Sequence, residues 1–85
     1  MSRYRVRVRV TPRPGLLDPQ GKAIHHALGN LGYVGVEDVR VGKSIELLVD
    51  ASDEHAARES ATRMSDQILA NPVTEDVQIT VEDAS

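Results

Sequence analysis

Arginine alternates strictly with an apolar or aromatic residue from position 3 to position 10, where the chain reads Arg-Tyr-Arg-Val-Arg-Val-Arg-Val. A period of two predicts a half-buried β-strand, because successive side chains of a strand point to opposite faces of its sheet. A helix would spread the arginines around its circumference. The strand is therefore expected to bury Tyr4, Val6, Val8 and Val10 on one face and to present Arg3, Arg5, Arg7 and Arg9 on the other.

The composition limits the core that this strand can join. With 85 residues the chain is long enough for one small domain, residues 1–85. It has no Phe and no Trp, and its only aromatic residues are Tyr4 and Tyr33. Aromatic side chains supply much of the buried area of most cores. A small core without them is marginally stable alone, which favours a homodimer or a dimer of dimers.

Charge and cysteine content argue against several classes of protein. The net charge of −3 has the wrong sign for binding phosphate backbones. Without cysteine there is neither a disulfide framework nor a thiolate metal site. The N-terminal residues lack the apolar region of a signal peptide, and no apolar run reaches the roughly 20 residues that span a bilayer. We expect a cytoplasmic protein that binds neither nucleic acid nor a membrane.

Capping residues and apolar periodicity predict two helices. Asp18 can cap the first, and Pro19 suits its first position because proline lacks the N–H that would be unpaired there. Gly32 favours the left-handed backbone that ends a helix. Ser52 is expected to cap the second helix, which should end before Asn71-Pro72. The predicted apolar stripes are Ala23, Ile24, Ala27, Leu28 and Leu31 in the first helix, and Ala57, Ala61, Met64 and Ile68 in the second.

Three further strands are predicted from alternation. A short strand over 38–41 contains Val39 and Val41, and a hairpin turn at Gly42-Lys43 joins it to a strand over 44–51. The last strand covers 76–82. The order βαββαβ predicts an α+β protein with a ferredoxin-like fold, a four-stranded antiparallel sheet with two helices on one face. Its usual spatial strand order is 4-1-3-2.

Opposite charges meet on the helix-free face of this predicted sheet. Arg40 joins the four arginines of the first strand there, and the acids expected beside them are Asp38, Glu46, Asp50, Asp76 and Glu82. Such a face is either solvated and neutralised by its own charges, or a polar docking surface with Leu48 as its apolar contact. An RNA-reading sheet is excluded, because no aromatic residue is expected on this face.

No residue pattern predicts catalysis. His25 and His26 point about 100° apart on a helix, His55 lies on the other helix, and there is no cysteine to complete a metal site. The chain has no GxGxxG or P-loop pattern and no nucleophile elbow. We therefore predict no catalytic, cofactor-binding or metal-ligating residue.

Three blocks resemble the PurS subunit of phosphoribosylformylglycinamidine (FGAM) synthase. The first is Asp18-Pro19-Gln20-Gly21 followed by Ala27-Leu28-x-x-Leu31-Gly32-Tyr33. The second is Val39-Arg40-Val41-Gly42-Lys43 followed by Glu46-Leu47, and the third is Leu69-Ala70-Asn71-Pro72-Val73-x-Glu75-Asp76. Together they extend over nearly the whole chain. One departure is Val77, where the family often carries an aromatic residue.

The resemblance implies a small non-catalytic subunit of purine biosynthesis, part of an ATP-dependent glutamine amidotransferase. It would bridge a synthetase (PurL-type) and a glutaminase (PurQ-type) subunit for assembly and ammonia transfer. ATP and Mg²⁺ would then bind in the synthetase, and no cofactor in this chain. The candidate interface residues are Arg40, Lys43, Asn71, Pro72 and Leu48. The alternative is a stand-alone ferredoxin-like regulatory domain that binds a small ligand at a subunit interface.

Overall fold

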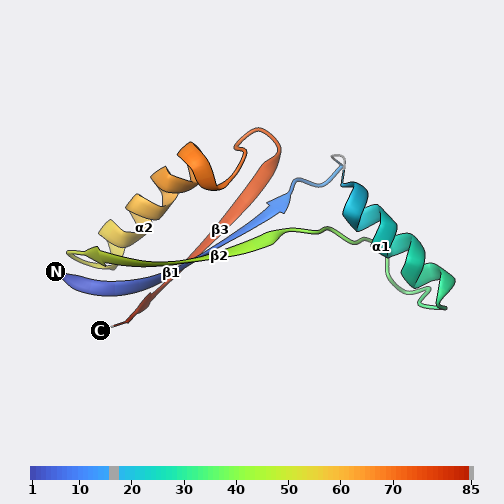
Figure 1. Cartoon of the computed structure of the whole chain (residues 1–85), viewed down its shortest axis with the longest axis horizontal. Helices are drawn as coiled ribbons and strands as arrows, with labels where there is room; N and C mark the ends of the chain where they lie inside the picture. Colours follow the sequence, from blue (N-terminus) through green and yellow to red (C-terminus); the bar gives the residue numbers. More distant parts are fainter. Residues whose placement is uncertain (16–17, 85) are drawn as a thin grey trace.

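A computed structural model describes residues 1–15 and 18–84 of the chain. Its strands are β1 (Ser2–Pro12), β2 (Lys43–Ala51) and β3 (Glu75–Asp83), and its helices are α1 (Pro19–Asn30) and α2 (Glu54–Met64). One wider, π-type turn, η1 (Ser65–Leu69), continues α2. The strands form an antiparallel sheet in the order β2-β1-β3 (Figure 1). The predicted α+β class is confirmed, as is the central position of the arginine-rich strand.

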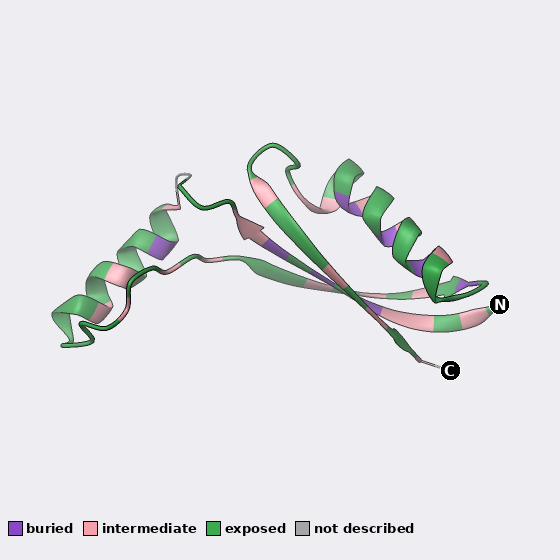
Figure 2. Cartoon of the chain, turned by 180° about the vertical axis from the view of Figure 1, so that it is seen from behind, coloured by how far each residue is buried: buried purple, intermediate pink, exposed green. Residues whose placement is uncertain are grey.

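The core lies between the sheet and α2. Val6, Val8 and Val10 of β1 are at most 1% exposed, and they form one cluster with Ala57 and Ala61 of α2. Figure 2 shows the buried residues of α2 on the side that faces the sheet. Small alanines allow the helix backbone to approach the sheet closely, so a core with no large aromatic residue can still be packed.

The first helix does not cover the sheet. It lies beyond the end of the strands, which gives the molecule an elongated shape of 52 × 26 × 14 Å (Figure 1). Much of its predicted apolar stripe is solvent-exposed, including Ile24 at 45% and the adjacent Leu31 at 74%. The prediction that both helices pack on one face of the sheet is therefore wrong.

The predicted strand over 38–41 is also wrong, and with it the four-stranded ferredoxin-like sheet. Among the described residues the sheet has three strands, and the chain runs without regular structure from Val36 to Gly42. Gly42-Lys43 is not a hairpin turn, because Lys43 already begins β2. The segment is held elsewhere: the Val41 backbone N–H donates to the Asp18 carboxylate at the start of α1 (2.9 Å). Two valines cannot outweigh that contact.

The helix boundaries agree with the predictions from capping residues better than the sheet does. Asp18 caps α1 with Pro19 at its first position, and Gly32 has a φ of +97°, as predicted. The second helix is capped by Asp53, which accepts a hydrogen bond from the Ala56 N–H, and not by Ser52. None of the helices in the described part of the chain is both long and apolar enough to cross a membrane.

Candidate functional site

The helix-free face of the sheet carries the arginine row, which we define as Arg3, Arg5, Arg7 and Arg9 of β1. Glu46 of β2 lies between two of these residues, with oxygens 3.0 Å from Arg5 Nε and 3.4 Å from Arg7 Nε. Glu82 of β3 accepts from Arg7 Nη1 at 3.2 Å. Asp50 of β2 pairs with Arg3 at 3.8 Å. Three of the four arginines are therefore neutralised within the sheet.

The predicted balance of five cations and five acids is not what the structure shows. Asp38 and Arg40 lie outside the sheet and pair with each other at 3.7 Å. Asp76 pairs with Arg13, at 3.3 Å. Within residues 1–15 and 18–84, Arg9 forms no ion pair, and its cross-strand neighbours, Ser44 and Gln78, are uncharged.

A second cluster joins the sheet to α1. The Asp18 carboxylate accepts a hydrogen bond from the Gly21 N–H at 3.0 Å, which caps the helix. It also accepts one from the Val41 N–H at 2.9 Å, which holds residues 36–42, here called the return segment, against the start of α1. These two hydrogen bonds, that from Gly21 first, lower the pKa of Asp18 because they stabilise its charged form. Asp18 thus links the start of α1 to the return segment, and we call the region where β1, α1 and the return segment meet the junction.

Two glycines at this junction have no space for a side chain. A Cβ at Gly21 would fall against the Val39 carbonyl oxygen and the Asp18 carboxylate, and one at Gly42 against the Val10 carbonyl oxygen. The backbones of α1, the return segment and β1 therefore approach one another as closely as glycine allows. This close approach gives a physical reason for glycine in both Asp18-Pro19-Gln20-Gly21 and Val41-Gly42-Lys43.

Arg13 connects the junction to the turn before β3. Its side chain donates to the Pro72 carbonyl at 2.7 Å and pairs with Asp76, while its backbone N–H donates to the Thr74 carbonyl at 2.9 Å. Within the turn, Asn71 Oδ1 accepts from the Val73 N–H at 3.0 Å. These contacts hold the turn that contains Asn71-Pro72, and we call it the clamped turn. The sequence shows Arg13 only as a loop arginine, and no signal in it reveals these contacts.

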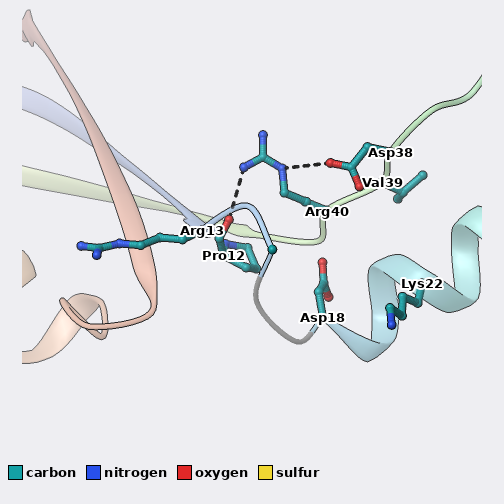
Figure 3. A pocket seen from close by; sticks show the side chains of 8 residues that line it. Pro12, Arg13, Asp18, Lys22, Asp38, Val39 and Arg40 are labelled. Carbon is teal, nitrogen blue, oxygen red and sulfur yellow. Dashed lines mark hydrogen bonds and ion pairs between the residues drawn. The ribbon is translucent and has the colours of Figure 1, made fainter.

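A cavity of about 440 Å³ opens at the same junction (Figure 3). The charged side chains around it are Arg13, Asp18, Lys22, Asp38 and Arg40. Arg40 also donates to the Pro12 carbonyl at 3.3 Å, so its guanidinium is held on two sides. Most of these charges already have partners in the chain, which leaves Lys22 as the cavity's least constrained cation.

The five candidate interface residues do not form one patch. Arg40 belongs to the junction, Asn71 and Pro72 to the clamped turn, and Leu48 to the arginine-row face, where it is 57% exposed. Lys43 begins β2 opposite Val10, at the end of the sheet nearest α1. Partner contact by any of them stays a prediction.

Two of the three histidines, His25 and His55, have local partners. His25 Nε2 lies 2.7 Å from the Val36 carbonyl oxygen and fastens the return segment to α1. His55 lies 3.3 Å from Glu59 on α2. The part of the chain that the structure describes contains no group of three or more His, Cys, Asp or Glu residues that could hold a metal ion.

Known proteins are similar to this chain in both sequence and fold. The family model of PurS, phosphoribosylformylglycinamidine (FGAM) synthase, matches residues 5–83. The chain belongs to the PurS family. The PurS subunit from Synechocystis sp. is 50% identical over 72 residues, which cover 85% of this chain and 72% of that protein.

Solved PurS structures have the same architecture. PurS from Bacillus subtilis superposes with a TM-score of 0.81 at 41% identity, covering 94% of this chain and 99% of that one. A chain in the structure of PurLQS from Thermotoga maritima gives a TM-score of 0.85 at 29% identity, covering 96% of this chain and 100% of that one. An α1 that lies off the sheet is therefore compatible with experimentally determined PurS folds.

Proposed function

We propose that this chain is the small, non-catalytic subunit of FGAM synthase in de novo purine biosynthesis. It holds a PurL-type synthetase and a PurQ-type glutaminase together, so that ammonia released from glutamine reaches the synthetase. The observation that carries the proposal is the match of nearly the full chain to a chain in the structure of PurLQS from Thermotoga maritima. ATP and Mg²⁺ belong to the synthetase in this scheme, and the site of action is the cytoplasm.

The arrangement of the chain supports an assembly role. An elongated molecule presents a large surface for its mass, and here the end around α1 and the face of the sheet differ in chemistry. One end carries the exposed apolar positions of α1, and the sheet carries a row of charges. A subunit that joins two unlike proteins requires such separate surfaces.

The chain acts in this proposal as a homodimer or a dimer of dimers. In residues 1–15 and 18–84 the buried apolar core consists of three valines and three alanines, which is small for a domain of this size. Ile24 and Leu31 at α1 remain exposed, and so do Tyr33 and Val34 just after it, at 61% and 91%. A second copy that covers these residues adds the apolar burial that one copy lacks.

A ligand-binding regulatory domain is the second candidate, and the junction cavity is the observation that favours it. Its volume would admit a small metabolite. Its charges, however, are largely engaged by one another and by backbone groups. The assembly role therefore agrees better with the geometry.

Reconstitution with the synthetase and glutaminase subunits of the same organism tests the proposal. Glutamine-dependent FGAM synthesis should require this chain, and the three proteins should elute together in the presence of glutamine and ATP. Activity driven by free ammonia should depend on it less. Full glutamine-dependent activity of the two large subunits without the chain would overturn the proposal, as would turnover of glutamine or ATP by the chain alone.

A further inference from the structure

Arg9 differs from the other members of the arginine row because the acids within its reach are engaged elsewhere. The diagonal neighbour on β2 is Glu46, which is already held by Arg5 and Arg7. The diagonal neighbour on β3 is Asp76, which is paired with Arg13. Diagonal cross-strand positions are about 7–8 Å apart, so no other residue of the flanking strands can supply a carboxylate at closer range.

The surroundings of Arg9 are polar and open. It is exposed, and it lines two adjoining hollows of the sheet surface, of about 270 and 250 Å³. Ser44 and Gln78, its direct neighbours across the ladder, border the larger one. A guanidinium with a hydroxyl and an amide beside it can bind a carboxylate with several hydrogen bonds.

Arg9 contributes no ion pair to the described part of the chain. Arg7 lies two residues away on the same face, so two positive charges are neighbours, and only Arg7 has acidic partners. The two acidic partners of Arg7 offset most of its repulsion of Arg9, but no carboxylate in the described residues pairs with Arg9 itself. An exposed charge that the fold does not use is available to an interface.

The same face provides an apolar contact. Leu48 is 57% exposed and lies four residues beyond Ser44 on β2, a separation of about 13 Å along the strand. An unpaired arginine and an exposed leucine about 13 Å apart on one face are the residue types expected of a protein interface, in which arginine and apolar residues are enriched. A phosphate site would need a cradle of backbone N–H groups, and those of the central strand β1 are used by the sheet on both sides.

We propose that Arg9 is the charged anchor of a docking surface on the arginine-row face, and that its partner is a carboxylate on a different protein of the synthase and not on a second copy of this chain. The partner segment places an acidic side chain at Arg9, Ser44 and Gln78 and an apolar side chain about 13 Å away on Leu48. This inference rests on the proposed function, because it assigns one surface to the assembly that the function requires.

The test compares Arg9→Glu with Arg63→Glu. Arg63 is an exposed arginine of α2, which packs against the opposite face of the sheet, so the two variants change net charge equally. Affinity for the synthetase and glutaminase subunits is measured by calorimetry at low and at 0.3 M salt. Arg9→Glu should weaken binding at least about tenfold, with a smaller salt dependence than wild type, and Arg63→Glu should not. Leu48→Ser should weaken binding without changing its salt dependence.

The outcomes separate this inference from the proposed function. If wild type assembles and Arg9→Glu assembles equally well, the docking surface is wrong while the function stands. If wild type does not assemble, both fall. Loss of self-association in Arg9→Glu, followed by sedimentation of the chain alone, would show that a second copy occupies the surface and would overturn the proposal. Binding of inorganic phosphate to wild type but not to Arg9→Glu would overturn it as well.

Discussion

Reversing the charge of Arg7 should destabilise the isolated chain, and reversing that of Arg9 should do so much less. Arg7 makes two ion pairs, with Glu46 at 3.4 Å and Glu82 at 3.2 Å, while Arg9 makes none among the described residues. The two positions lie on the same strand and the same face, two residues apart. Arg9→Glu is therefore a control matched in chemistry, strand and net charge.

The magnitude follows from the number of contacts. The Arg7 side chain is 52% exposed, so each pair contributes only about 0.2–1 kcal/mol. Arg7→Glu loses these two ion pairs. It also places a new carboxylate near those of Glu46 and Glu82, and each of the two repulsions is of similar size to a lost pair. These four contributions sum to an expected loss of about 1–4 kcal/mol, which lowers the Tm of a domain this size by at least about 4 °C. Arg9→Glu should change Tm much less, because it breaks no ion pair among the described residues, and its new carboxylate lies beside Arg7 as well as diagonally from Glu46 and Asp76.

Thermal unfolding of the three proteins at 20 mM and 0.5 M NaCl, with sedimentation to confirm equal oligomeric state, measures the difference. High salt should reduce the gap between the two variants, because exposed charges are screened over a few ångströms at that ionic strength. Equal Tm values for Arg7→Glu and Arg9→Glu would refute the ion-pair assignment. So would a gap that persists undiminished at high salt.

Three further predictions concern the junction and the neighbouring end of the sheet. Gly21→Ala should lower the free energy of unfolding in urea by about 1–3 kcal/mol, because its Cβ has no space. The control is Gly29→Ala in the same helix, where a Cβ meets nothing within 4 Å, and it should stabilise the chain by about 0.5–1 kcal/mol. Equal effects of the two substitutions would contradict the close approach at Gly21. Because the folded-state pKa of Asp18 is lowered, its stabilisation is present above its ordinary pKa and is lost as pH falls through the lower folded value. Acid unfolding of Asp18→Asn should accordingly be less steep than that of wild type below about pH 4, and identical curves would contradict this. Lys43→Glu should leave the isolated chain folded and weaken assembly with the partner subunits, whereas unchanged assembly would exclude Lys43 from the interface.

Long alternating segments correctly predicted the strands of the sheet, whereas the short alternation at Val39 and Val41 predicted a strand that does not form. The strand over 3–10 and those over 44–51 and 76–82 each maintain a period of two for several residues, and all three form. Val39 and Val41 offer only one period, and a hydrogen bond from the Val41 N–H to Asp18 decides the conformation of that segment. The local sequence predicts Asp18 as a helix cap. Its hydrogen bond to the Val41 N–H joins residues 23 positions apart, and periodicity cannot predict such a contact.

The position of α1 has a similar explanation. Its stripe of small and apolar residues predicts burial, but a stripe does not specify which surface buries it. The clamps at Asp18, Gly21 and Gly42 fix the helix beyond the end of the strands, so its own sheet cannot reach it. The exposed Ile24 and Leu31 are then a consequence of the junction and not of a weak apolar pattern.

The ion pairs of the arginine row depended on strand register, which the sequence left open. With Glu46 opposite Arg7, its carboxylate also reaches Arg5 diagonally, so one acid serves two arginines. A balance of five cations and five acids therefore conceals an uneven distribution. Arg9 loses its partner because of geometry, although the composition of the face contains enough acids.

The residues that carry the resemblance to PurS lie in a different part of the molecule from the proposed docking anchor. Asp18, Gly21, Val41 and Gly42 belong to blocks that carry the resemblance, and each holds α1 at the end of the sheet. Arg9 belongs to none of these blocks and contributes no ion pair to the described fold. Changes at the junction should consequently alter stability and assembly together, because the shape itself is lost. A change at Arg9 should alter assembly alone, which makes shape and recognition separable in this small subunit.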